Sequence, residues 1–365
     1  MTKKRRHRRN NVNATQKATL NKDAAGSEEV GDRLSKLPND ILLNILERVD
    51  TLDAFAGLKR LWLRNMRFGE SDIPNILSTC KLLESLHLTN CDSGMNSVVQ
   101  LEHAKLTELE VKYGKFEIVE LTCLPKLQRV SYKGWFNSHK GPLYFGFVPQ
   151  LSKLRLTKIG TRPTRTLELS QLLDNVPHIG NLHLDFQSEK IWVLPESPKL
   201  LRPVLSQLQQ VNLDNLSEGC DLAWTMFILE AAPSLKELCI TVLDHWCNMV
   251  MRDKEFRKNN GFCEKADVEW KPPPPPDFKH KNLVKLTIYG FQPDDIFVRF
   301  IRCVMEHAVN MAEISLHDRK KVCLRCGVLD PEMKYPSRYP RNADERTHIT
   351  EELGRSLPAM VRLWT

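Results

Sequence analysis

Apolar residues recur along this chain in the spaced pattern L-x-x-L-x-L, with Ile, Val, Met or Tyr replacing some of the leucines. Ten copies occur, and they begin at Leu58, Leu83, Leu106, Leu127, Leu151, Ile179, Leu208, Leu235, Leu283 and Met311. The end of each copy alternates apolar and polar residues, which predicts a short strand with one buried face. Segments 73–80, 170–177 and 225–233 precede such strands and have helical character. We therefore expect strands that alternate with helices and turns.

Most successive copies begin 21 to 29 residues apart, and one interval is 48 residues long. This spacing is typical of leucine-rich repeats. One unit cannot bury its own apolar face, so stacked units share a continuous core and a parallel sheet. The predicted fold class is an α/β leucine-rich-repeat solenoid, with repeats over residues 55–244 and again from residue 283. The outward-pointing strand residues would line one concave surface.

Two other regions belong to the C-terminal half. Residues 245–282 interrupt the repeats and contain five consecutive prolines, Pro272 to Pro276. Such a run is stiff and extended; we interpret it as part of an insertion loop, with a ligand for a proline-recognition domain as the alternative. Residues 283–365 hold the last repeats, followed by a helical run at 344–353 and an apolar strand at 360–363.

The N-terminal region has a different character. Residues 1–31 lack periodic apolar positions and predict a disordered leader, whose basic cluster is either a nuclear-import signal or a solvated tail. Over residues 32–54, apolar positions three and four apart predict one amphipathic helix. Pro38 suits the first turn of that helix. A lone helix of this length is marginal in water, so its apolar stripe must dock against something.

Composition narrows the function classes. The net charge is +8, of which residues 1–31 carry +5, so the folded part is nearly neutral and a nucleic-acid-binding body is not indicated. No apolar run approaches the ~20 residues that cross a bilayer, and no apolar stretch typical of a signal peptide follows the basic N-terminus. The ten cysteines are mostly scattered singly. We expect reduced thiols and a location in the nucleus, the cytoplasm or both.

Sequence motifs for catalysis or metal binding are few. The phosphate-binding patterns G-x-G-x-x-G and G-x-x-x-x-G-K are absent, and no nucleophile or paired-carboxylate site stands out, so neither an enzyme nor a cofactor is expected. Cys323-x-x-Cys326 has metal-like spacing, but a structural zinc needs four ligands, and only hand-picking Cys303, His307 or His317 would complete them. We interpret the two cysteines as ordinary reduced thiols that bind no metal, with a structural zinc site and a redox pair as the alternatives. Trp192 and Trp224 are assigned to the core, and Trp135 and Trp270 are candidate contact residues in loops.

The predicted N-terminal helix resembles the opening of an F-box. The family pattern L-P-x-D-I-L-x-x-I-L is matched by Leu37, Pro38, Asp40, Ile41, Leu42, Ile45 and Leu46. Joined to leucine-rich repeats, it is similar to the plant F-box/LRR proteins, and the tail with Cys323-x-x-Cys326 and Tyr339-Pro340-Arg341 is similar to their FBD-type C-terminal region. The resemblance implies a non-catalytic adaptor that links a target protein to a Skp–cullin ubiquitin ligase. Its adaptor contacts would be Leu37, Pro38, Ile41, Leu42, Ile45 and Leu46.

One departure from the family pattern matters. Residues 51–54 lead almost directly to the first repeat strand, so the later F-box helices are absent and the F-box is truncated. One helix should hold a Skp-type adaptor weakly. The alternative function is an interaction scaffold or decoy that no longer binds the ligase. Neither nucleic acid nor a membrane is expected as a partner. Target-binding candidates are the strand positions Ser85, His87, Glu108, Glu110, Lys153, Arg155, Asn181, His183, Asn212 and Asp214.

Overall fold

A computed structural model describes nine stretches of the chain. They are residues 57–94, 97–135, 141–159, 166–188, 191–217, 220–243, 274–318, 338–353 and 360–364. The predicted leader (1–31), the F-box-like helix (32–54), Trp270 and the Cys323-x-x-Cys326 pair lie outside the described residues. The leucine-rich repeats themselves lie largely within them.

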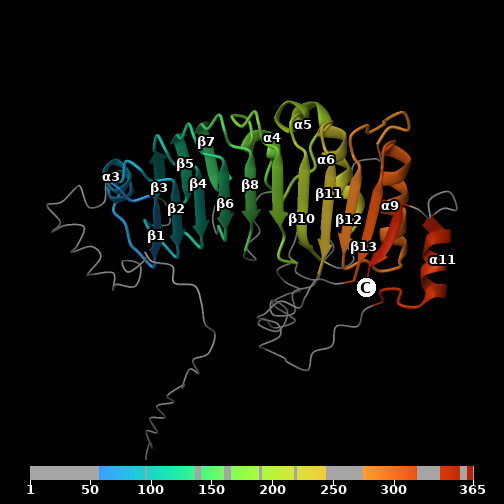
Figure 1. Ribbon diagram of the computed structural model, residues 1–365. Helices are drawn as coiled ribbons and strands as arrows, with labels where there is room; N and C mark the ends of the chain where they lie inside the picture. The colour runs from blue at the N-terminus through green and yellow to red at the C-terminus, as the bar shows by residue number, and fades with distance from the viewer. Residues whose placement is uncertain are drawn as a thin grey trace, which may run out of the picture.

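An eleven-stranded parallel sheet forms the length of the molecule (Figure 1). Its strands follow chain order: β1 (Arg60–Arg64), β2 (Ser85–Thr89), β4 (Glu108–Lys112), β6 (Arg129–Lys133), β8 (Lys153–Thr157), β9 (Asn181–Asp185), β10 (Gln210–Leu216), β11 (Glu237–Val242), β12 (Lys285–Tyr289), β13 (Glu313–His317) and β14 (Val361–Trp364). The ten strands predicted from the repeat are confirmed, and the apolar segment at the C-terminus supplies the eleventh. The solenoid fold is therefore as expected.

Register explains why the repeat specifies this sheet. In β4, Leu109 and Val111 are fully buried while the residues between them are partly exposed. Leu109 pairs with Val130 of β6, which in turn pairs with Leu154 of β8. Equivalent apolar residues of successive units therefore stack in columns behind the sheet, and burying them supplies the main stabilisation.

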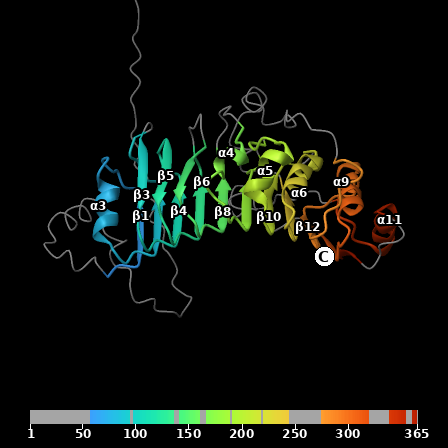
Figure 2. The same cartoon turned by 90° about the horizontal axis from the view of Figure 1, so that it is seen from above.

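The other side of the core is covered by helices at both ends and by a second sheet between them (Figure 2). The second sheet is parallel and has the order β3 (Val98–Glu102), β5 (Ile118–Cys123), β7 (Leu143–Phe147). The helices are α3 (Asp72–Thr79), α4 (Leu169–Leu172), α5 (Pro198–Leu205), η2 (Leu222–Thr225), α6 (Met226–Ala231), α9 (Asp295–His307) and α11 (Ala343–Leu353). The helices contact the second sheet at both of its edges, because α3 packs against β3 and α4 packs against β7.

The second sheet was not predicted, and unit length explains it. Its three strands belong to the units that begin at Leu83, Leu106 and Leu127, which are only 23, 21 and 24 residues long. A five-residue strand covers about 16 Å, whereas an eight-residue helix covers about 12 Å. Short units therefore span the height of the solenoid more economically with a strand. The longer units on either side hold α3, α4 and α6, at the three segments predicted to be helical.

Aromatic rings join the central units behind the sheet. Trp192 packs at right angles to Trp135, with 5.2 Å between ring centroids, and lies 5.3 Å from Phe186. Phe186 also packs on Trp224 at 5.6 Å. The assignment of Trp192 and Trp224 to the core is confirmed. That of Trp135 to a contact surface is wrong: only 7% of it is exposed, because its ring closes the end of the core beside Tyr132.

In two units, a buried histidine side chain holds the turn that precedes the repeat strand. At the equivalent position, three residues before the repeat motif begins, the other units contain no histidine. In His280, Nδ1 accepts the backbone N–H of Leu283 at 3.0 Å, and Nε2 lies 2.9 Å from the carbonyl oxygen of Ala232 in the preceding unit. His103 has the same arrangement toward Lys105 and Cys80. Because a backbone N–H can only donate, Nδ1 must be unprotonated and Nε2–H must donate. Each ring is therefore neutral and ties one unit to the one before it.

These turns predict acid sensitivity. Burial lowers the pKa of His280 and of His103, so the folded chain binds these protons less readily than the unfolded chain. Their contribution to the free energy of unfolding is full above the unfolded pKa of about 6.5 and is lost as the pH falls below it. Urea unfolding at pH 7.5 and 5.5 should show a smaller acid-induced loss in the His103→Gln/His280→Gln variant. An identical loss in both proteins would contradict the assignment.

Candidate functional site

On the polar side of the eleven-stranded sheet, which we call the outward face, most strands contribute one residue to each of three rows, and β14 contributes Arg362 and Trp364 to two of them. In-register pairing aligns the middle row across the whole sheet. The middle row consists of Trp62, His87, Glu110, Ser131, Arg155, His183, Asn212, Cys239, Thr287, Ser315 and Arg362. All ten predicted target-binding candidates lie on this face. Nine are partly or fully exposed, whereas Ser85 is buried and does not offer a contact surface.

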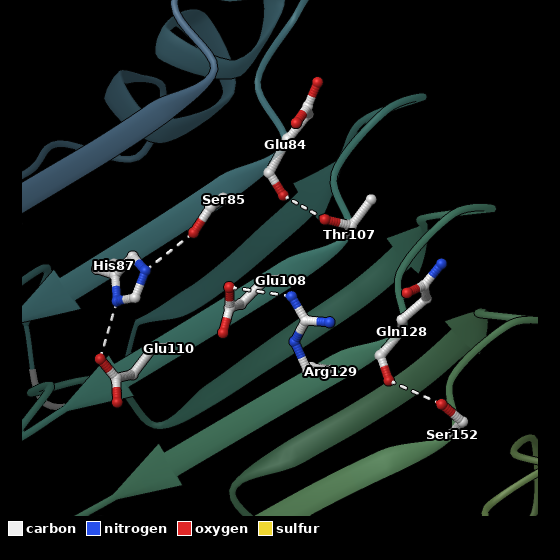
Figure 3. Close-up of polar contacts among 9 residues, drawn as sticks. All are labelled: Glu84, Ser85, His87, Thr107, Glu108, Glu110, Gln128, Arg129 and Ser152. Carbon is white, nitrogen blue, oxygen red and sulfur yellow. Dashed lines mark hydrogen bonds and ion pairs between the residues drawn. The ribbon is translucent and has the colours of Figure 1, made fainter.

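Ser85, His87 and Glu110 form a hydrogen-bonded chain (Figure 3). The Ser85 hydroxyl lies 2.9 Å from His87 Nε2, and His87 Nδ1 lies 2.8 Å from a carboxylate oxygen of Glu110. The connectivity matches that of a hydrolase triad, but catalysis also needs free N–H donors for an oxyanion. Here β2 lies between β1 and β4, so its backbone N–H groups are used in the parallel ladder. The chain therefore orients His87 rather than forming an active site.

Glu110 is held in its ionised form. Burial disfavours the charge, but hydrogen bonds from Lys112 and His87 outweigh it and lower the pKa of Glu110. The Lys112 ammonium lies 2.8 Å from its second oxygen. The neighbouring Glu108 pairs with Arg129 at 3.3 Å, as Figure 3 shows. Both acidic residues of this part of the face are consequently neutralised by local partners.

The outward face has two halves of opposite charge. In the half formed by β1, β2, β4, β6 and β8, which we call β1 to β8 of the large sheet, seven basic residues accompany the two acidic residues Glu108 and Glu110. The basic residues are Arg60, Arg64, Lys112, Arg129, Lys133, Lys153 and Arg155. Strands β9 to β14 place four acidic residues against two basic ones on the outward face; the acidic ones are Asp185, Asp214, Glu237 and Glu313. Among the described residues, neither Lys153 nor Arg155 has an ion-pair partner.

Three of the four predicted candidates on β9 and β10 contact other side chains of the same face. His183 Nε2 lies 2.9 Å from Asp214, and Thr241 donates to the other oxygen of that carboxylate at 2.9 Å. Asn181 donates to the side-chain oxygen of Gln210 at 2.6 Å. Asn181 and Asp214 therefore already take part in hydrogen bonds within this face, and a ligand would have to displace those bonds to use these two side chains. The basic half carries no such penalty at Lys153 and Arg155.

Tryptophan residues occupy both ends of the outward face. Trp62 on β1 is 60% exposed and packs on the His87 ring at 5.1 Å. Trp364 on β14 stacks on His317, which stacks on Tyr289. Trp62 was missed as a candidate, although its position between two inward leucines of the first repeat strand already indicated an outward aromatic ring. Exposed tryptophans of this kind are enriched among residues that dominate binding energy.

The described residues contain neither a metal-binding cluster nor a helix suited to crossing a membrane. Within the described stretches, no group of three or more His, Cys, Asp or Glu side chains could hold a metal ion. Two of the hand-picked ligands, Cys303 and His307, lie on α9, where His307 Nδ1 bonds to the Cys303 carbonyl at 2.8 Å. Burial raises the pKa of the Cys303 thiol, which disfavours a thiolate ligand. None of the described helices is long and apolar enough to cross a bilayer.

Comparison with known proteins identifies the family of the repeat region. A family model described as "At1g61320/AtMIF1, LRR domain" matches residues 45–342. The match begins inside the segment that resembles an F-box and ends inside the region that resembles an FBD tail, and its description names only the repeats. No curated protein matches the chain.

Proposed function

Because the chain belongs to the At1g61320/AtMIF1 family of leucine-rich-repeat domains, we propose that its outward face binds a target protein. Repeat solenoids mediate protein–protein interactions through their extended sheet surfaces. The observation that carries the proposal is the continuous polar face. It offers the exposed ring of Trp62 and the exposed cations Lys153 and Arg155, for which the described residues supply no ion-pair partner. The chain itself would be non-catalytic and would act in the nucleus, the cytoplasm or both.

The finer proposal is that the chain delivers this target to a Skp–cullin ubiquitin ligase. It rests on the F-box-like pattern, with Leu37, Pro38, Ile41, Leu42, Ile45 and Leu46 contacting the Skp-type adaptor. Catalysis would then reside in the partner ligase subunits. The repeat domain would select the target, and the helix would connect it to the ligase.

Co-expression with a plant Skp-type adaptor tests this connection. We expect a stoichiometric complex with the full chain and its loss in Leu42→Asp/Ile45→Asp, because a charge on the apolar stripe cannot be buried unpaired. The matched control is Leu43→Asp/Asn44→Asp, which adds the same charge at two of the unmatched positions of the pattern and should retain the complex. Soluble, folded chain that does not co-purify with the adaptor would refute the ligase role.

The second candidate function is an interaction scaffold or decoy that binds targets without delivering them. One observation favours it: β1 begins at Arg60, only six residues after the F-box-like segment ends at Ala54. That leaves no length for the remaining F-box helices. Under this alternative the target-binding face is unchanged, and only the adaptor contact is lost.

A further inference from the structure

We propose that the basic half of the outward face, strands β1 to β8, binds an acidic segment of the target protein in an extended conformation. The segment would run across the strands, with an apolar side chain on Trp62 and carboxylates at Lys153 and Arg155. This inference rests on the proposed function and deepens it by naming the chemistry of the partner.

Unpaired charge is the first argument. Lys153 and Arg155 are both exposed and project from the same strand two residues apart. Their nearest charged neighbour on β6, Arg129, is engaged by Glu108, and on β9 they face Asn181 and His183. The planar Arg155 guanidinium can bind one carboxylate through two hydrogen bonds. An acidic ligand would therefore supply partners that the described residues of the chain do not.

The second argument is the state of the two acids in this half. Glu108 is paired with Arg129, and Glu110 accepts hydrogen bonds from both Lys112 and His87. Their charges are compensated locally, so the excess of basic residues sets the field over β1 to β8. A field of one sign steers ligands of the opposite sign to the surface.

Register gives the length of the bound segment. Trp62, His87, Glu110, Ser131 and Arg155 share one row across five adjacent strands. With strands about 4.8 Å apart, Trp62 and Arg155 are about 19 Å apart, and an extended peptide of about six residues covers this distance. Ser131 lies between the two ends, where its hydroxyl can hydrogen-bond to a peptide backbone, whereas both ring nitrogens of His87 are already engaged by Ser85 and Glu110.

The same row favours a protein over a nucleic acid. Glu110 lies midway between Trp62 and Arg155, and Glu108 lies beside it on β4. A nucleic-acid strand carries a phosphate at every nucleotide, but the middle row offers no lysine or arginine between Trp62 and Arg155 to receive those charges. A peptide can place neutral residues there and concentrate its acids at β8.

Selection from a displayed library of random twelve-residue peptides on the purified full chain tests the proposal. We expect enriched peptides to carry an aromatic or large aliphatic residue about six positions from a pair of acidic residues. Binding of a synthetic enriched peptide, followed by fluorescence anisotropy, should weaken at least tenfold in Lys153→Glu/Arg155→Glu and in Trp62→Ala. The charge-matched control Lys199→Glu/Lys281→Glu, at exposed sites off the outward face, should bind as the unmodified chain does. Circular dichroism of each variant would verify that it is folded.

The possible failures are distinguishable. Two results would overturn the inference but still support target binding by the outward face. One is enriched peptides without acidic residues, and the other is peptides whose binding is weakened only by substitutions in the other half, such as Glu237→Lys on β11. A library that yields no enriched peptide would overturn the inference alone. Enriched peptides whose binding is insensitive to every outward-face variant would overturn the inference and would also count against the proposed function. Tighter binding of single-stranded DNA than of the peptide at Lys153 and Arg155 would also overturn it.

Discussion

Gly290→Ala is expected to lower the free energy of unfolding by about 4 kcal/mol. Gly290 follows β12 with φ +77°, a conformation that costs any residue with a side chain. A Cβ there would lie 2.1 Å from the carbonyl oxygen of Val242, at the end of β11. The backbone cannot move aside, because Thr241 of β11 and Tyr289 of β12 are paired in the ladder. Urea unfolding followed by circular dichroism measures the loss.

Gly94→Ala is the matched control for this prediction. Gly94 also has a positive φ, +99°, but nothing lies within 4 Å of the Cβ it would gain. Only backbone strain remains, which should cost about 1 kcal/mol. Equal losses in the two variants would show that conformation, and not the close approach of β11, makes glycine necessary at residue 290.

Phe186→Ala should cost about 4 kcal/mol of unfolding free energy. The ring is fully buried and lies between Trp192 and Trp224, at 5.3 and 5.6 Å. Its removal leaves a cavity and breaks the aromatic contacts that join the unit of β9 to the unit that holds η2 and α6. Phe186→Leu should cost about 1.5 kcal/mol, because it refills much of the volume.

Urea unfolding followed by tryptophan fluorescence would test the Phe186 prediction, since Trp192 and Trp224 report on the same cluster. Phe147→Ala is the control, because Phe147 at the end of β7 is 58% exposed. Its loss should change stability by no more than about 0.5 kcal/mol. A comparable effect at both positions would refute the view that this aromatic cluster couples neighbouring units.

The large sheet could be predicted from the repeat pattern for two reasons. The spacing of the leucines within a unit shows which strand residues point inward, and the recurrence of that spacing in the next unit shows which residues they stack on. What covers the core was harder to predict. Segments such as 118–123 are short and follow compact turns, so unit length rather than local periodicity decides between strand and helix. Trp135 was misassigned for a related reason: it follows a strand end, and only the neighbouring ring of Trp192 shows that this end is closed over.

Strand alternation was enough to predict that the candidate residues point outward. It did not predict which side chains they form hydrogen bonds or ion pairs with. His87 and Glu110 are 23 residues apart and meet because their strands align in register. Ser85 was taken for a contact residue, whereas its burial makes it a support for His87. Which cations stay unpaired depends on side-chain conformations: Arg129 turns to Glu108, while Lys153 and Arg155 find no such carboxylate among the described residues.

The alternation of inward and outward residues along each strand also bears on how such a protein can diverge. A change at an outward position such as Ser131 or Asn212 leaves the apolar columns untouched and should alter stability by less than about 0.5 kcal/mol. Partner choice can therefore drift by single substitutions while the scaffold persists. Duplicated copies of a gene could acquire different partners early, long before their cores differ.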